Sequence, residues 1–242
     1  MPSPPATPPR PRVGISTDEA QSIEMIDPAL YNTGLEAVRG MTADGLRRRF
    51  RETLPWTHEM LGDQQFENLS SEGEPPYRHA SVLVPIVVRD ELRILFTQRT
   101  ATLKDHAGQV SFPGGRAEPG DANAADTALR EAEEEIGLAR DHVEVIGTLP
   151  PYHTVTRYEV APVVALVHPP FEMALQSGEV AEAFEVPLDF ILDPVNHQKR
   201  SRPWNGRMRH FYAMPYDGHF IWGATAAMLR NLYHFLRATG PA

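Results

Sequence analysis

Apolar residues gather in short runs that predict buried β-strands. Residues 80–88 form such a run, which is rich in valine and interrupted once by proline, and residues 92–97 follow after a charged turn. Further apolar runs occupy residues 143–149 and 160–167. Runs of this length, bounded by turn residues and rich in β-branched side chains, are typical of strands covered on both faces. The sequence therefore predicts a sheet with buried central strands.

Helical spacing and turn signals complete the predicted elements. Residues 42–54 combine a capping threonine with an arginine-rich helix, whose arginines we expect to form a solvated face. Residues 224–238 are amphipathic and end at a Gly-Pro pair, as expected for a closing helix. Residues 211–214 and 219–222 flank the Asp217-Gly218 pair, which is a hairpin signal.

Three glutamates lie on one face of a further predicted helix. Glu131, Glu134 and Glu135 are spaced at i, i+3 and i+4, so their side chains point the same way. Carboxylates at that spacing repel one another, and clustered carboxylate oxygens are the ligands that Mg²⁺ and Mn²⁺ prefer. For this spacing alone, a solvated acidic helix face is the simpler interpretation.

The sequence around this helix indicates a loop, a helix and a second loop. Gly114 and Gly115 permit a tight turn and a close approach of the backbone to a ligand. Asp121 or Asn123 is the expected N-cap, and Gly137 is the expected C-cap. With the strands and the closing helix, this predicts an α/β (α+β) fold, a helix–sheet–helix sandwich around a mixed sheet.

Composition narrows the possible functions. The formal net charge of −9 over 242 residues disfavours binding to nucleic acid or to an anionic membrane. The absence of cysteine excludes disulfides and thiolate chemistry and fits a cytoplasmic protein. The longest apolar run, residues 80–88, is too short to span a bilayer.

We expect a disordered proline-rich tail at residues 1–12, a helical and irregular extension at residues 13–74, and the main domain at residues 75–238.

The acidic helix resembles the Nudix hydrolase box. From Arg130 to Leu138 the chain matches the second half of that box, Arg-Glu-apolar-x-Glu-Glu-x-Gly-apolar. The first half departs from it, because Asp121 stands where the family has glutamate, and eight residues rather than seven separate it from Arg130. The resemblance implies a Nudix-type α/β/α sandwich with a catalytic loop-helix-loop, and it leaves the role of Asp121 open.

The preceding segment is similar to one branch of that family, the coenzyme A diphosphatases. Residues 95–115 follow the signature of the branch, which runs from Leu-Leu-Thr-x-Arg to Phe-Pro-Gly-Gly, with Arg99 in place. Phe96 and Thr100 stand where the signature has Leu and Ser or Ala, and Lys104 stands where it has Arg. Lysine keeps the charge but lacks the planar fork with which arginine grips a phosphate.

The resemblance implies hydrolysis of the pyrophosphate bond of coenzyme A or an acyl-coenzyme A. The products would be adenosine 3′,5′-bisphosphate and 4′-phosphopantetheine or its acyl form. The implied metal ligands, for Mg²⁺ or Mn²⁺, are Glu131, Glu134 and Glu135. The implied catalytic residues are Glu131, Glu134 and Arg130, with Glu134 our choice of general base and Arg130 orienting a glutamate. The implied substrate-binding residues are Arg99, Lys104, Gly114, Gly115 and Arg116.

Three other functions stay open. The first alternative is another Nudix diphosphatase, which acts on ADP-ribose, NADH or a nucleoside triphosphate. The second is a non-catalytic Nudix ligand sensor, and the third is a protein with a plain acidic helix that binds no metal. Sensors usually lose box carboxylates that this chain retains.

Five more polar residues are candidates for the site. His106 is a possible base or a surface group, and Tyr152 and His153 line the pocket rim or belong to a packed turn. Glu182 and Glu185 supply a carboxylate from outside the box or lie on a solvated helix face.

Overall fold

The computed structural model describes residues 22–24, 38–60, 76–103, 105–204 and 207–238. The predicted tail at residues 1–12, most of the predicted extension, and Lys104 lie outside the described residues.

The main sheet has eight strands and is mixed. Its central path runs β4-β3-β2-β8-β6, while β5 pairs with β2, β7 with β8 and β9 with β3. Among its described strands, only β2 and β8 pair in parallel, and the other pairs are antiparallel. The strands are β2 (Arg78–Val88), β3 (Leu92–Arg99), β4 (Val110–Ser111), β5 (Gly114–Arg116), β6 (Val143–Thr148), β7 (Tyr152–His153), β8 (Tyr158–Val167) and β9 (Val180–Pro187).

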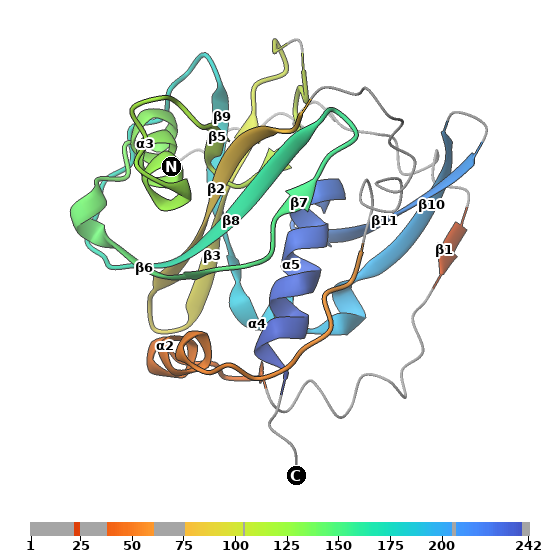
Figure 1. Cartoon of the computed structure of the whole chain (residues 1–242), viewed down its shortest axis with the longest axis horizontal. Helices are drawn as coiled ribbons and strands as arrows, with labels where there is room; N and C mark the ends of the chain where they lie inside the picture. The colour runs from red at the N-terminus through yellow and green to blue at the C-terminus, as the bar shows by residue number, and fades with distance from the viewer. Residues whose placement is uncertain (1–21, 25–37, 61–75, 104, 205–206, 239–242) are drawn as a thin grey trace, which may run out of the picture.

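Two helices cover opposite faces of this sheet. Along β2, Leu83 and Val87 pack against α3 (Ala124–Ile136), whereas Val84 and Ile86 belong to the cluster that includes α5 (Gly223–Leu236). Figure 1 shows α3 and α5 on either side of β2 and β8. The strand is apolar at nearly every position because both of its faces are buried. The predicted helix–sheet–helix sandwich is confirmed.

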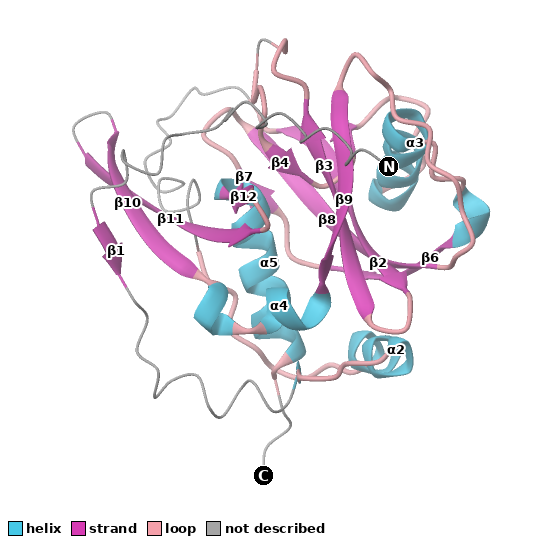
Figure 2. Ribbon diagram, turned by 180° about the vertical axis from the view of Figure 1, so that it is seen from behind, coloured by secondary structure: helices cyan, strands magenta, loops and turns pink. Residues whose placement is uncertain are grey.

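A second, four-stranded sheet lies beside α5 (Figure 2). Its order is β1-β10-β11-β12. The predicted hairpin joins the last two of these strands, where Asp217 and Gly218 adopt φ angles of 43° and 79°. The remaining elements are β1 (Ser22–Glu24), β10 (Gln198–Trp204), β11 (Arg207–Tyr216), β12 (His219–Trp222), α4 (Leu188–Leu192), η4 (Arg140–His142) and η5 (Pro194–Asn196).

Helix α2 (Ala43–Arg51) starts at the predicted cap, where the Thr42 hydroxyl accepts a hydrogen bond from the Gly45 amide. Its arginines do not all form a solvated face. Arg49 is buried, donates to the Phe235 carbonyl at 2.9 Å and lies 4.0 Å above the Phe235 ring, which ties α2 to α5. Arg47 forms an ion pair of 2.6 Å with Glu144 on β6. The prediction was therefore wrong for these two arginines, because they pack against the sheet and α5.

The segment after α2 is bound to α5 through Glu59. Its carboxylate accepts hydrogen bonds from Arg230 at 3.1 Å and His234 at 2.9 Å. Its backbone makes two bonds with the side chain of Asn231, of 2.9 and 3.0 Å. Burial opposes the ionised form of Glu59, but His234 and Arg230 outweigh it and lower the pKa of the carboxyl to about 2.

His197 lies buried beside this cluster in its neutral form. Its Nε2 donates to the Ile191 carbonyl at 2.7 Å, since a carbonyl can only accept. Its Nδ1 is then an acceptor and takes a hydrogen bond of 3.1 Å from Arg230. Burial lowers the pKa of His197 to about 3, and the charges of Arg230 and His234 act in the same direction.

This arrangement predicts loss of stability in mild acid. An unfolded histidine titrates near about pH 6.5, whereas folded His197 has a pKa of about 3. Between these values the unfolded chain binds a proton that the folded chain does not, so stability falls as pH falls through this window. Replacing His197→Gln should reduce the slope of unfolding free energy against pH by up to about 1.4 kcal/mol per pH unit.

Urea unfolding of the full chain at several pH values between about 7 and 5 measures this slope. The exposed His106→Gln is the matched control and should keep the wild-type slope. An unchanged slope in His197→Gln would show that the proton is taken up elsewhere.

Candidate functional site

Helix α3 has well-defined ends. Its N-cap is Asn123, whose side chain accepts a hydrogen bond of 3.1 Å from the Asp126 amide. Its C-cap is Gly137, with a φ of 70° and a backbone bond of 2.9 Å to the Glu133 carbonyl. Of the two predicted N-caps, Asn123 is the observed one, and Asp121 instead accepts hydrogen bonds from Arg130. The caps fix which side chains face the preceding glycine loop.

The glycine pair lies directly against the acidic face of α3. The Gly114 amide donates to Glu135 Oε2 at 3.2 Å. A Cβ atom on Gly115 would lie 2.5 Å from the carboxyl carbon of Glu131, and one on Gly114 would lie 2.4 Å from the Ser81 carbonyl oxygen. Position 114 therefore requires glycine, because a side chain there would collide with the backbone of β2, whereas a side chain at position 115 would displace the Glu131 carboxylate.

Arg130 connects the box carboxylates. Its Nη1 donates to Glu131 at 3.0 Å and to Glu134 at 3.1 Å. Its Nε and Nη2 donate to the two oxygens of Asp121 at 3.0 and 3.1 Å, and Nη2 also reaches the Arg116 carbonyl. One guanidinium thus links the helix, the loop before it and the end of β5.

Asp121 occupies the place left open by the irregular first half of the box. Its side chain is only 7% exposed, and it also accepts hydrogen bonds from the Thr127 hydroxyl and the Glu118 amide, both 2.9 Å long. The Arg130 hydrogen bond is the main reason why the pKa of Asp121 lies well below its usual range. A shorter acid with one more residue before the arginine therefore still reaches the guanidinium.

The box carboxylates differ in environment. Glu135 is 5% exposed, and burial raises its pKa to about 7 despite the Gly114 amide and Arg99, whose Nη1 lies 3.9 Å from Glu135 Oε1. Burial also raises the pKa of Glu131, whereas the Glu134 side chain is 57% exposed. Poor hydration therefore disfavours the ionised carboxylates at the buried end of the face.

A fourth carboxylate, that of Glu179, acts on this group from outside the box. Its charge contributes to the raised pKa of both Glu131 and Glu135. The adjacent Val180 pairs with Arg99, whose Nη1 lies 3.9 Å from Glu135 Oε1. Glu179 immediately precedes β9 and is far from the box in sequence. Sequence reasoning missed it, because only the pairing of β9 with β3 brings it to the site.

Glu182 and Glu185 are not this carboxylate. Both lie on strand β9 rather than on a helix. Glu185 forms a bidentate ion pair of 2.7 Å with Arg89, and Glu182 lies 3.4 Å from His219. The helix-face interpretation of these two glutamates was therefore wrong.

Four other predicted residues also lie within the described ranges. Arg116 is exposed at the end of β5, and His106 is an exposed loop residue bonded to Gln109 at 3.0 Å. Tyr152 and His153 form strand β7 rather than a turn. His153 bonds to Glu159 at 3.0 Å, and Tyr152 is buried in the cluster that includes α5.

The donor set suits a hard divalent cation. Glu131, Glu135 and Glu179 supply only carboxylate oxygens, and their mutual repulsion in a desolvated place is relieved by added positive charge. Within the described ranges, however, no three acidic or histidine side chains already converge on one point. Arg130 instead binds one oxygen of Glu131 and one of Glu134, which leaves the other oxygen of each carboxylate for a cation.

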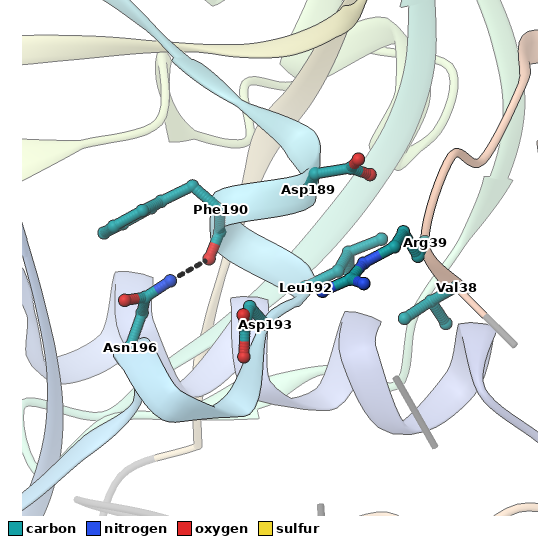
Figure 3. Close-up of a pocket in the computed structure, with 7 residues that line it drawn as sticks. All are labelled: Val38, Arg39, Asp189, Phe190, Leu192, Asp193 and Asn196. Carbon is teal, nitrogen blue, oxygen red and sulfur yellow. Dashed lines mark hydrogen bonds between the residues drawn. The ribbon is translucent and has the colours of Figure 1, made fainter. Parts of the chain in front are cut away.

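A separate pocket of about 260 Å³ lies at α4 and η5 (Figure 3). Helix α4 begins where β9 ends, at the opposite end of that strand from Glu179. The pocket is therefore not part of the candidate site. Its lining residues are Val38, Arg39, Asp189, Phe190, Leu192, Asp193 and Asn196.

Comparison with known proteins identifies the family. The NUDIX domain model matches residues 77–208. An uncharacterized Nudix hydrolase NudL from Photorhabdus laumondii is 41% identical over 184 residues, which are 76% of this chain and 92% of the relative. Its Escherichia coli K12 counterpart is 42% identical over 156 residues, covering 64% and 81%. The chain belongs to the Nudix hydrolases, which act on phosphorus-containing anhydrides of small molecules and generally use divalent metal ions.

Among solved structures, the Nudix hydrolase RenU from M. smegmatis is similar, with 18% identity, a TM-score of 0.45 and coverage of 66% of this chain and 85% of that one. None of the described helices is long and apolar enough to cross a membrane.

The contact between Gly115 and Glu131 predicts that Gly115→Ala impairs turnover without unfolding the chain. The new methyl group occupies the space of the Glu131 carboxylate, which must move. A displacement of this size in an active site costs about a hundredfold in rate. Release of phosphate-containing products from a diphosphate substrate, at saturating Mg²⁺, measures the effect.

Gly120→Ala, in the loop after β5, is the matched control, because a Cβ there meets no atom within 4 Å. It should keep wild-type activity and thermal stability. Full activity in Gly115→Ala would show that the position of Glu131 is unimportant.

Proposed function

We propose that this Nudix hydrolase splits the pyrophosphate bond of coenzyme A or its acyl derivatives. The main support is the meeting of two segments that are far apart in the chain. Arg99, from the segment similar to the coenzyme A diphosphatase signature, ends β3 beside the box residue Glu135, with 3.9 Å between Nη1 and Oε1. Arg99 Nε is buried and has no hydrogen-bond partner among the described residues, so this donor is unsatisfied and would gain from an anionic partner.

The proposed cofactor is Mg²⁺ or Mn²⁺, held by Glu131, Glu134 and Glu135, and we add Glu179 to this set. A bound divalent cation polarises phosphoryl oxygens, stabilises the leaving phosphate and lowers the pKa of an attacking water. The protein supplies the orientation: the Gly114 amide fixes one oxygen of Glu135.

Arg130 is the proposed orienting residue of the box. It is held by Asp121 and contacts both Glu131 and Glu134. Glu134 remains our proposed general base, and its 57% exposure leaves it open to solvent water. Glu179 is the competing base, because its charge acts on two of the same carboxylates.

The substrate charge requires local cations. Coenzyme A is strongly anionic and the protein carries a formal net charge of −9, so the average field opposes binding. Arg99, Lys104 and Arg116 are the proposed phosphate ligands. The unsatisfied Nε donor of Arg99 and the exposure of Arg116 support this assignment.

A substrate panel tests the proposal directly. We expect the full chain with Mg²⁺ or Mn²⁺ to hydrolyse coenzyme A, acetyl-coenzyme A or a long-chain acyl-coenzyme A with higher kcat/KM than ADP-ribose, NADH or dATP. Mass spectrometry should identify adenosine 3′,5′-bisphosphate as one product. A preference for ADP-ribose, NADH or dATP would instead establish the alternative Nudix diphosphatase, and absence of turnover with retained ligand binding would establish a sensor.

Comparison of coenzyme A with 3′-dephospho-coenzyme A tests the cation assignment. A charge-assisted hydrogen bond to the extra phosphate contributes about 1.5–3 kcal/mol, which is about tenfold to a hundredfold in kcat/KM. The wild type should prefer coenzyme A, and Arg99→Ala or Lys104→Ala should lose that preference.

The matched control is Arg48→Ala, which removes an exposed arginine on α2 and should keep the preference. Equal kcat/KM values of the wild type for the two substrates would show that neither Arg99 nor Lys104 binds the 3′-phosphate.

A further inference from the structure

We infer that Thr100 is a positioning residue that holds Glu179 against the box carboxylates. This inference rests on the proposed metal-dependent function, in which Glu179 joins the cation-binding set. Thr100 follows β3 directly and faces the turn that ends at β9.

Thr100 holds this turn by two hydrogen bonds. Its amide donates to the Glu179 carbonyl at 2.9 Å, and its hydroxyl donates to the Gly178 carbonyl at 3.1 Å. The hydroxyl has a single proton, and a carbonyl can only accept. The 3.2 Å contact between the Thr100 and Thr102 hydroxyls therefore has Thr102 as its donor. The bond to Gly178 is thus the one that the Thr100 side chain contributes.

The other end of the turn is held by α3 itself. The Gln176 amide donates to the Glu135 carbonyl at 2.9 Å, and the Gln176 carbonyl accepts from Glu179 and Val180 at 3.0 and 2.9 Å. The turn before β9 is therefore hydrogen-bonded at one end to the C-terminal part of α3 and at the other end to Thr100, directly after β3. At the Thr100 end, a side chain adds to the backbone bonds.

A bulge in β9 brings Glu179 to Thr100. Gln98 pairs with Glu182, but Arg99 pairs with Val180, so residue 181 is an extra residue on β9. In a regular ladder Val180 would face position 100, and Glu179 would lie beyond it. Bulges of this kind re-aim side chains next to active sites. Here the bulge places the Glu179 backbone within reach of the Thr100 amide.

The experiment compares three variants of the full chain. Thr100→Val removes the hydroxyl at constant shape, Thr100→Ser restores it, and Thr102→Val is the matched control that removes the neighbouring hydroxyl. Mn²⁺ affinity is measured by electron paramagnetic resonance without substrate, and kcat and KM are measured with the best substrate of the panel. Thermal unfolding of each variant reports on the fold.

We expect Thr100→Val to weaken Mn²⁺ binding and to lower kcat by about tenfold each, with KM little changed, as for other groups that orient metal ligands. Thr100→Ser and Thr102→Val should resemble the wild type, and all four proteins should unfold at similar temperatures. Wild-type Mn²⁺ affinity and kcat in Thr100→Val would overturn the inference, as would equal losses in Thr100→Ser. A wild type that binds Mn²⁺ but leaves coenzyme A intact refutes only the substrate proposal, and the Mn²⁺ affinities then decide the role of Thr100.

Discussion

The parallel pairing of β2 with β8 is the constraint on which the rest of the structure depends. Both strands are buried on two faces, so each supplies one row of side chains to α3 and another to the cluster that includes α5. The same β2 pairs with β5 at its start, which fixes Gly114 and Gly115 against the sheet. Strand β2 therefore positions both the Gly114-Gly115 pair and α3, and this brings the glycines into contact with the acidic face of the helix.

The candidate site concentrates negative charge where water is scarce. Glu135 and Glu131 have raised pKa values, chiefly because they are buried, and Glu179 adds repulsion. Arg130 relieves part of this repulsion and is itself held by Asp121. Such a group favours capture of a cation more than a solvated acidic face does, because the carboxylates gain more from a counter-charge when they are poorly hydrated. This difference in burial distinguishes the candidate site from a solvated acidic helix face, which was the simpler interpretation of the glutamate spacing.

Sequence alone predicted the elements whose pattern is set by burial on the main sheet. The runs at residues 80–88 and 160–167 were recognisable because both faces of these strands are covered. Strands β9 and β10 were missed, since charged residues interrupt their apolar pattern. The partner of β9 is also far away in the chain, whereas β10 pairs with the adjacent β11. The box glutamates could be identified because they share one helix face, whereas Glu179 reaches the site only through the long-range pairing of β9 with β3. The buried state of Arg49 was equally inaccessible, because its partner Phe235 lies near the other end of the chain.

The anchoring of residues 43–60 to α5 has a consequence for where the folded unit can be divided. The family match begins at residue 77 and ends at residue 208, inside β11. A fragment cut at those limits would interrupt a strand in mid-course and would remove α5, with the apolar face that it buries against the sheet. Retaining α5 but starting at residue 77 would leave the Phe235 ring without Arg49 and Phe50, and the Asn231 side chain without the Glu59 backbone. The smallest autonomous piece of this protein is therefore larger than the segment by which its family is recognised.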